Sequence, residues 1–202
     1  METIKFILVI LLALSLFSLP ACSIASNHSS TASAVTDSQN VSERSFPDYN
    51  YDGDDPLEKA VYETEIKRDP VQKAGCFLIV APRIIKISEE DSFIKVFLIS
   101  YGKTFLCHND ETLTKDTGWC IPVAVTYTKE DEKYVLQKYE MPVEGAYEES
   151  IRSFCVTPQT GEAISGLADQ MMDIDFTELK SNLDANLQKY LQENDLSNMK
   201  VK

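Results

Sequence analysis

Beyond residue 53, four cysteines and one histidine are the side chains best suited to redox, metal or nucleophilic chemistry. They are Cys76, Cys107, His108, Cys120 and Cys155. An even number of cysteines outside the cytoplasm predicts disulfide bridges. Cys107 and Cys120 flank one polar segment between predicted strands, so we pair them and assign Cys76 to Cys155. Four buried free thiols are the alternative.

Neither a zinc site nor a Cys-His nucleophile fits these spacings. Cys107 and His108 are neighbours in a predicted strand, so their side chains point to opposite faces of the sheet. No two cysteines have the C-x-x-C spacing that is typical of structural zinc sites. We therefore expect no bound metal, no cofactor and no catalytic residue here.

Residues 48–53 place carboxylate or amide side chains at alternate positions and end in glycine, as the first half of an EF-hand calcium loop does. The second half departs from that pattern. Lys59 stands where the loop needs a bidentate glutamate, and Pro56 interrupts the sequence. The pattern favours an acidic segment that leads into a helix cap.

Asp169, Asp173 and Asp175 are clustered acidic residues next to apolar helix positions. Carboxylates in a cleft between a sheet and its helices could act as the acid and base of a small hydrolase. Helix capping explains the same three residues. A hydrolase therefore stays open as the alternative to a binding protein.

Residues 19–22 read Leu-Pro-Ala-Cys and close an apolar run, in the order of a bacterial lipobox. The sequence predicts a signal peptide at residues 1–21 and a lipid anchor on Cys22, carrying acyl chains such as palmitate. Cleavage after Ser23 and an uncleaved membrane helix are the alternatives. In all three cases the rest of the chain lies outside the cytoplasm, and a lipobox places it on the outer face of the cell membrane.

The formal net charge of −13 limits the partners of this protein. Nucleic acid and anionic membrane surfaces carry the same sign and are disfavoured. We therefore expect no nucleic-acid partner, and contact with the membrane through the lipid anchor. The expected macromolecular partner is another envelope or membrane protein.

Composition divides the chain into three parts. After the signal peptide, residues 22–53 are rich in Ser, Thr, Ala and Asn and predict a flexible tether. Residues 54–202 have the length of one ordinary domain. We treat them as a single domain.

Within that domain, the hydrophobic period changes along the chain. Residues 56–68 have apolar positions four apart and predict a helix. Residues rich in Ile, Val and Phe then predict two hairpins, 76–101 and 119–139, with a further strand between them. Apolar stripes at helical spacing dominate after residue 147. The prediction is an α+β fold, in which an antiparallel sheet of four to five strands is covered by N-terminal and C-terminal helices.

Three stretches of this sequence resemble a known family. They are residues 121–127 (Ile-Pro-Val-Ala-Val-Thr-Tyr), residues 134–151 and residues 189–191. Over roughly residues 84–191 the chain resembles an extracytoplasmic domain of Gram-positive lipoproteins, which is similar to a region appended to some membrane metallopeptidases of the β-lactam sensor-transducer type. The resemblance implies an accessory or sensory role and carries no catalytic residues.

These observations predict a non-catalytic binding or sensory domain on a membrane-anchored lipoprotein. Function concentrates on loops held by a rigid scaffold, so we expect contacts at residues 109–118 and 141–147. Trp119 borders the first of these loops and is the binding candidate, because aromatic side chains dominate binding hot spots.

Overall fold

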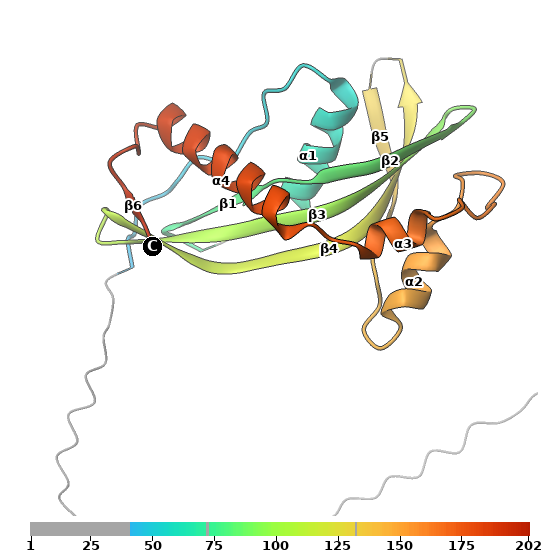
Figure 1. Ribbon diagram of the computed structural model, residues 1–202. Coiled ribbons are helices and arrows are strands. Elements are labelled where there is room, and N and C mark those ends of the chain that lie inside the picture. The colour runs from blue at the N-terminus through green and yellow to red at the C-terminus, as the bar shows by residue number, and fades with distance from the viewer. Residues whose placement is uncertain (1–40, 72, 132) are drawn as a thin grey trace, which may run out of the picture. The chain divides into compact units, whose positions relative to one another are not determined.

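The computed structural model describes residues 41–202, except Gln72 and Glu132 (Figure 1). Cys22 and the predicted lipobox lie outside the described residues. In chain order the helices and strands are α1 (Pro56–Arg68), β1 (Cys76–Val80), β2 (Arg83–Glu90), β3 (Phe93–His108), β4 (Thr112–Glu130), β5 (Lys133–Glu140), α2 (Tyr147–Phe154), α3 (Leu167–Met172), α4 (Phe176–Glu193) and β6 (Lys200–Val201).

The two longest helices begin at acidic caps. The Asp55 carboxylate accepts a hydrogen bond from the backbone N–H of Glu58 at 2.8 Å, and Pro56 occupies the first helical position of α1. In α4 the Asp175 carboxylate accepts from the backbone N–H of Thr177 at 2.9 Å. Local sequence therefore sets the start of both helices.

The long strands β3 and β4 form the centre of the sheet. One edge of β3 pairs with β1 over residues 102–106 and with β2 over residues 93–99. The outer edge of β4 pairs with β5 in antiparallel fashion and, near its start, with the short parallel strand β6. Hydrogen-bonded neighbours across the sheet follow the order β1-β3-β4-β5. The two remaining strands add to it, with β2 paired to β3 and β6 paired to β4.

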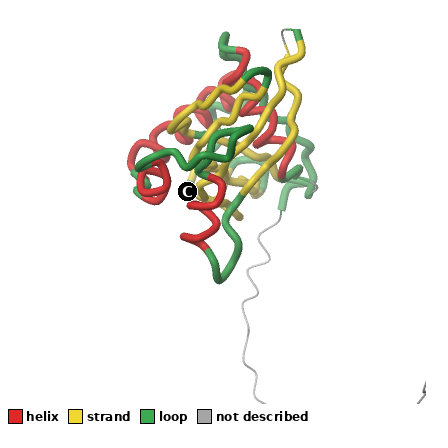
Figure 2. The backbone as a smooth tube through the Cα atoms, turned by 90° about the vertical axis from the view of Figure 1, so that its right-hand side faces the viewer, coloured by secondary structure: helices red, strands yellow, loops and turns green. Residues whose placement is uncertain are grey.

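Helices cover both faces of this sheet, as Figure 2 shows in side view. Successive side chains of β3 point to opposite faces of the sheet and therefore pack against different helices. Val96 and Leu98 pack with Val61 of α1, whereas Phe97 packs with α2 and α3 and Ile99 belongs to the core under α4. In Figure 1, α4 crosses in front of the sheet and α1 lies behind it.

The predicted α+β class is confirmed, but the described sheet has six strands instead of four to five. The further strand expected between the two hairpins is instead the second half of the continuous β3, and two other strands are additional. One arises because Pro82, which lacks the N–H that a strand needs, separates β1 from β2. The other is β6, whose two residues pair with Thr112 and Leu113. Such a short strand has no period that a sequence pattern could reveal.

The predicted loop at residues 109–118 is wrong. β3 turns directly into β4 through Asn109 and Asp110, whose φ angles are 52° and 57°. Asn and Asp tolerate this left-handed conformation and favour tight hairpin turns. Residues 112–118 extend β4 as a polar, mostly exposed strand, which is why their composition resembles that of a loop.

The predicted tether is also wrong for residues 41–53. Phe46 and Tyr49 are buried in the core, and Phe46 packs against Phe77 of β1 with ring centroids 5.2 Å apart. Tyr190 of α4 donates a hydrogen bond to the carbonyl of Pro47 at 2.7 Å. The aromatic residues in this segment attach it to the domain.

None of the helices in the described part of the chain has the length and hydrophobicity to cross a membrane.

Candidate functional site

Trp119 lies within β4, opposite Gly102 of β3, and not at the edge of a loop. Its ring covers the Gly102 backbone so closely that a Cβ there would come within 2.4 Å of the ring. Glycine is needed at this close approach, because a larger residue would displace the indole. The indole N–H donates a hydrogen bond to Ser100 Oγ at 2.6 Å. The predicted binding candidate is therefore part of a hydrogen-bonded network.

This network, which we call the Glu65 relay, comprises Glu65, Ser100, Trp119 and Tyr139. Ser100 Oγ donates to Oε2 of Glu65, and the Tyr139 phenol donates to Oε1 at 2.9 Å. Glu65 is 1% exposed. Both carboxylate oxygens accept from neutral hydroxyl groups, which offsets part of the cost of burying the carboxylate inside the domain.

Burial controls the protonation of the relay. Desolvation raises the pKa of Glu65 above its ordinary value of 4.5, while hydrogen bonds from Ser100 and Tyr139 and the positive charge of Arg68 act in the opposite direction. Burial also raises the pKa of Tyr139 and of Tyr127 above the usual phenol range. Both phenols therefore stay protonated at neutral pH and act as hydrogen-bond donors.

Arg68, the last residue of α1, lies beside the relay. Its guanidinium carbon lies 4.2 Å from the centre of the Trp119 ring and 5.8 Å from the centre of the Tyr139 ring, within cation–π range. Its Nε is 3.8 Å from Glu65 Oε2, which is an ion pair but not a hydrogen bond. That Nε is buried and has no hydrogen-bond partner among the described residues.

A cavity of about 350 Å³ opens beside Arg68, between α1 and the strands β4 and β5. We call it the α1–β5 cleft. Its volume falls within the range of small-molecule sites. The lining residues are Ala60, Glu63, Thr64, Lys67, Arg68, Tyr127, Tyr134, Leu136 and Tyr139. One wall is therefore polar and helical, and the other is aromatic.

The aromatic wall is held in place by its own contacts. The Tyr127 hydroxyl is 2.9 Å from Thr64 Oγ1 and donates to the Ala60 carbonyl at 3.3 Å. Tyr134 meets Tyr127 edge to face, with ring centroids 6.3 Å apart. The register of β5 shifts at Gln137, and this bulge keeps residues before and after it on the cleft face.

The accessible groups of this cleft suit binding better than catalysis. Glu65 and Ser100 lie behind its wall and are not among the lining residues. Glu63, the carboxylate that does line it, is about half exposed and ion-paired with Lys67 at 3.2 Å. Among the described lining residues, no nucleophile is hydrogen-bonded to a base, which is the arrangement that covalent catalysis needs.

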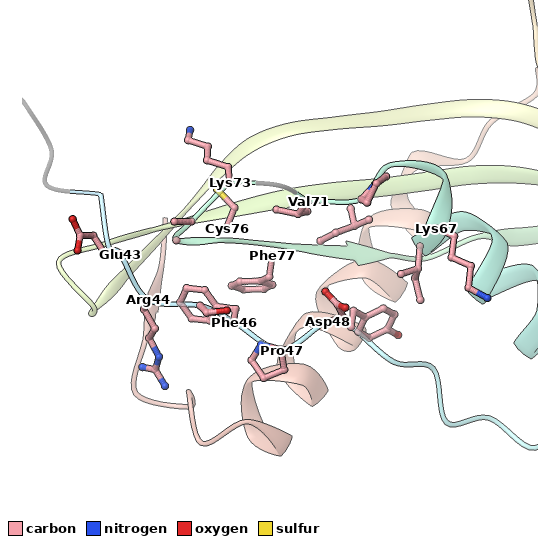
Figure 3. A pocket seen from close by; sticks show the side chains of 17 residues that line it. Glu43, Arg44, Phe46, Pro47, Asp48, Lys67, Val71, Lys73, Cys76 and Phe77 are labelled. Atoms are coloured by element: carbon pink, nitrogen blue, oxygen red, sulfur yellow. The ribbon is translucent and has the colours of Figure 1, made fainter.

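A larger cavity of about 490 Å³ lies on the other side of the end of α1, between residues 43–49 and β1 (Figure 3). Phe46 and Phe77 face each other in it, and Lys73 points away. Its wall includes the loop that contains Gln72, which is outside the described residues. We place no site there.

The three clustered aspartates do not form a catalytic group. Asp169 is exposed and pairs with Arg152 at 3.2 Å. Asp173 is the C-terminal cap of α3, and Asp175 caps α4. All three are exposed. Side-chain capping explains Asp175 and a surface ion pair explains Asp169, whereas Asp173 ends α3 only through its backbone N–H, which donates to the carbonyl of Asp169.

The acidic residues around the half calcium loop also have local roles. Asp52 forms an ion pair with Lys189 of α4, and Asp55 caps α1. Tyr51 stacks on Tyr62 with ring centroids 3.8 Å apart. Within residues 41–202, leaving aside positions 72 and 132, no group of three or more His, Cys, Asp or Glu side chains could hold a metal ion.

The predicted bridge between Cys107 and Cys120 is wrong. Cys120 pairs with Tyr101, six positions along β3 from Cys107, so the two Cα atoms are about 20 Å apart at about 3.3 Å per residue. A disulfide needs a separation below about 7 Å. The pairing failed because residues 109–118 form a turn and a strand instead of a loop whose ends meet.

The second predicted bridge is wrong as well, since Cys76 and Cys155 are both free. Cys76 lies in β1, opposite Leu106 of β3. Cys155 follows the last residue of α2 and belongs to a different cluster of the core. Burial raises the pKa of all four thiols, that of Cys155 to about 11. They are therefore weak nucleophiles, as the alternative of buried free thiols requires.

The other predicted contact loop, residues 141–147, is exposed. Val143 is 62% exposed, and Met141 and Tyr147 are each nearly half exposed. These three side chains are open to solvent at the end of β5 and the start of α2.

Glu65, Arg68, Ser100 and Tyr139 were not singled out from the sequence. Glu65 follows Leu57 and Val61 at helical spacing and thus falls on the buried face of α1. A charged residue on the apolar stripe of a helix is the one sequence signal that could have identified this site.

No family model, curated protein or solved structure matches the chain. The functional conclusion therefore depends on the chemistry of the site itself.

Proposed function

We propose that the protein is a lipoprotein anchored through Cys22 on the outer face of the cell membrane, and that its α+β domain binds a ligand without changing it chemically. The lipobox-like residues 19–22 support the anchor. The α1–β5 cleft supports the binding role.

One observation carries the binding role, namely the position of the Glu65 relay. It holds Trp119 and Tyr139, whose rings flank Arg68 at the edge of the cleft, while the carboxylate itself stays buried behind them. Buried, hydrogen-bonded groups that position surface side chains are typical of preorganised binding sites. A catalytic carboxylate would instead need to reach the bound molecule.

The binding role can be tested with the full-length protein in detergent and a small-molecule extract of the cell envelope. Trp119 is the sole tryptophan, so its fluorescence reports on this site. We expect a fraction of the extract to change the emission, and we expect mass spectrometry to recover the bound compound unchanged. Conversion of that compound by the wild-type protein would support the hydrolase alternative and contradict the proposal.

The anchor needs a separate measurement. Mass spectrometry of the mature protein should find a chain that begins at Cys22 and carries a diacylglyceryl thioether. A chain that begins at Ile24, or an intact leader peptide, would contradict the lipoprotein proposal without affecting the cleft.

A further inference from the structure

The guanidinium of Arg68 has more donors than the described residues satisfy. Arginine carries five N–H donors in a planar fork. Its nearest carboxylate oxygen, Glu65 Oε2, is 3.8 Å from Nε and already accepts from Ser100. Nε is buried without a partner, whereas the side chain as a whole is 22% exposed, so the donors that a ligand would reach are those of the two Nη atoms. The described residues therefore leave hydrogen-bonding capacity on a cation at the edge of the cleft.

The other polar groups of the cleft are largely engaged. Tyr139 donates to Glu65, and the Tyr127 hydroxyl contacts Thr64 and Ala60. Lys67 forms an ion pair with Glu63 on the rim. A ligand thus meets the planar Arg68 guanidinium, the Lys67–Glu63 ion pair at the rim and a wall of aromatic rings.

The shape of the donor group favours an anion that accepts two parallel hydrogen bonds, which carboxylates and phosphates both do. The Arg68 guanidinium carbon lies 4.2 Å from the centre of the Trp119 ring, so this planar cation already contacts one aromatic ring. A carboxylate is planar as well, and pairs edge to edge with a guanidinium through two parallel hydrogen bonds. The rings of Tyr127 and Tyr134 and the aliphatic side chain of Leu136 offer contact to a flat apolar group.

We propose that the α1–β5 cleft binds a small organic carboxylate, with its carboxylate group on Arg68 and its flat apolar part against Tyr127, Tyr134 and Leu136. This inference rests on the proposed binding function and names the class of ligand. The cavity of about 350 Å³ has room for a ring and a short acid side chain.

Three probes of similar shape differ in the group that would face Arg68. They are phenylacetate, its neutral amide phenylacetamide, and benzylphosphonate. Isothermal titration calorimetry on the full-length protein in detergent should give phenylacetate the highest affinity. Arg68→Gln should weaken phenylacetate binding by about tenfold or more, since charge-assisted hydrogen bonds are roughly twice as strong as neutral ones. Arg68→Lys should restore only part of the loss, because lysine keeps the charge but lacks the fork.

The matched control is Arg152→Gln. Arg152 is an exposed arginine that pairs with Glu148 and Asp169 on another part of the domain. Its removal changes the net charge equally and should leave phenylacetate affinity unchanged.

Tyr134→Ala tests the apolar half of the site without touching the Glu65 relay. We expect weaker phenylacetate binding in this variant and no change in the control Tyr147→Ala, which removes an exposed tyrosine at the start of α2. The two tyrosine variants keep the proposal testable if Arg68→Gln fails to fold, which circular dichroism would reveal.

Equal affinity for acid and amide, or unchanged binding in Arg68→Gln, would overturn the carboxylate inference and leave the binding function intact. Preference for benzylphosphonate would do the same and would identify a phosphate-type anion. If all three probes fail to bind while the envelope extract still changes Trp119 fluorescence, the ligand class is wrong and the binding function stands. If neither probes nor extract bind, both proposals fail.

Discussion

Helices α1 and α4 cover opposite faces of one sheet, yet their buried stripes differ in kind. The buried positions of α4 are Leu179, Leu183, Leu187, Tyr190 and Leu191. The buried positions of α1 begin with Leu57, Val61 and Tyr62 and end with Glu65. α4 therefore contributes mainly apolar burial, whereas the end of α1 places a carboxylate inside the domain.

Because of this difference, we expect the layer under α4 to contribute most to stability and the end of α1 to contribute most to the binding cleft. Apolar burial is the dominant favourable contribution to folding. A buried carboxylate stabilises little by itself, and its hydrogen bonds serve instead to fix the orientation of its partners. We therefore expect substitutions under α4 to change stability most, and substitutions around α1 to change the cleft.

The largest effect is expected for Leu183→Ala in α4. Leu183 is 1% exposed, and truncating a buried leucine destabilises a domain by about 3 kcal/mol. Urea denaturation should show this loss, whereas Gln188→Ala on the exposed face of α4 should change stability by less than about 0.5 kcal/mol. A small loss at Leu183 would mean that the α4 layer is not the main core.

A smaller effect is expected for Gly102→Ala under the Trp119 ring. The new Cβ would lie 2.4 Å from the ring, and overpacking of this kind costs about 1–3 kcal/mol. The tryptophan emission should shift as the indole moves. Combining the change with Trp119→Ala should cost less than the sum of the two single variants, and strict additivity would show that the ring does not cover Gly102.

The smallest effect is expected for Glu65→Gln, and it depends on pH. Burial raises the pKa of Glu65 in the folded state above 4.5. Between the unfolded and folded pKa values the folded state binds more protons, so its free energy of unfolding falls as pH rises through that window. Glu65→Gln removes this dependence, and the variant should gain stability relative to wild type as pH increases across the window.

Tyr139→Phe tests the same pH dependence of stability from the side of a partner of Glu65. It removes a hydrogen bond that lowers the pKa of Glu65, so the fall in stability with pH should extend to higher pH than in wild type. Parallel pH profiles for wild type and Glu65→Gln would contradict the assignment of a buried carboxylate to α1.

Local patterns predicted much of the scaffold. The helix caps at Asp55 and Asp175 and the apolar stripe of α4 follow from short-range chemistry and a period of 3.6 residues. The two central strands were expected only in part. β3 runs without the break expected after Tyr101, and β4 begins at Thr112 instead of Trp119, because threonine and charged residues in an exposed strand resemble a loop.

The candidate site could not be predicted in the same way. The hydrogen bonds that build it join Glu65 to Ser100, 35 residues away, and to Tyr139, 74 residues away. No local period connects such positions, and only the folded sheet brings them together. Trp119 was selected from the sequence for a loop contact, and the fold gives it a different role beside Arg68.

The most direct test of the binding cleft is the indole N–H signal in a ¹H–¹⁵N NMR spectrum. Trp119 is the sole tryptophan, so there is one such signal, and its N–H donates to Ser100 beside the cleft. Adding phenylacetate should shift this signal in wild type and leave it in place in Arg68→Gln. A signal that does not move in wild type, while amides of α4 do, would contradict a binding site beside α1.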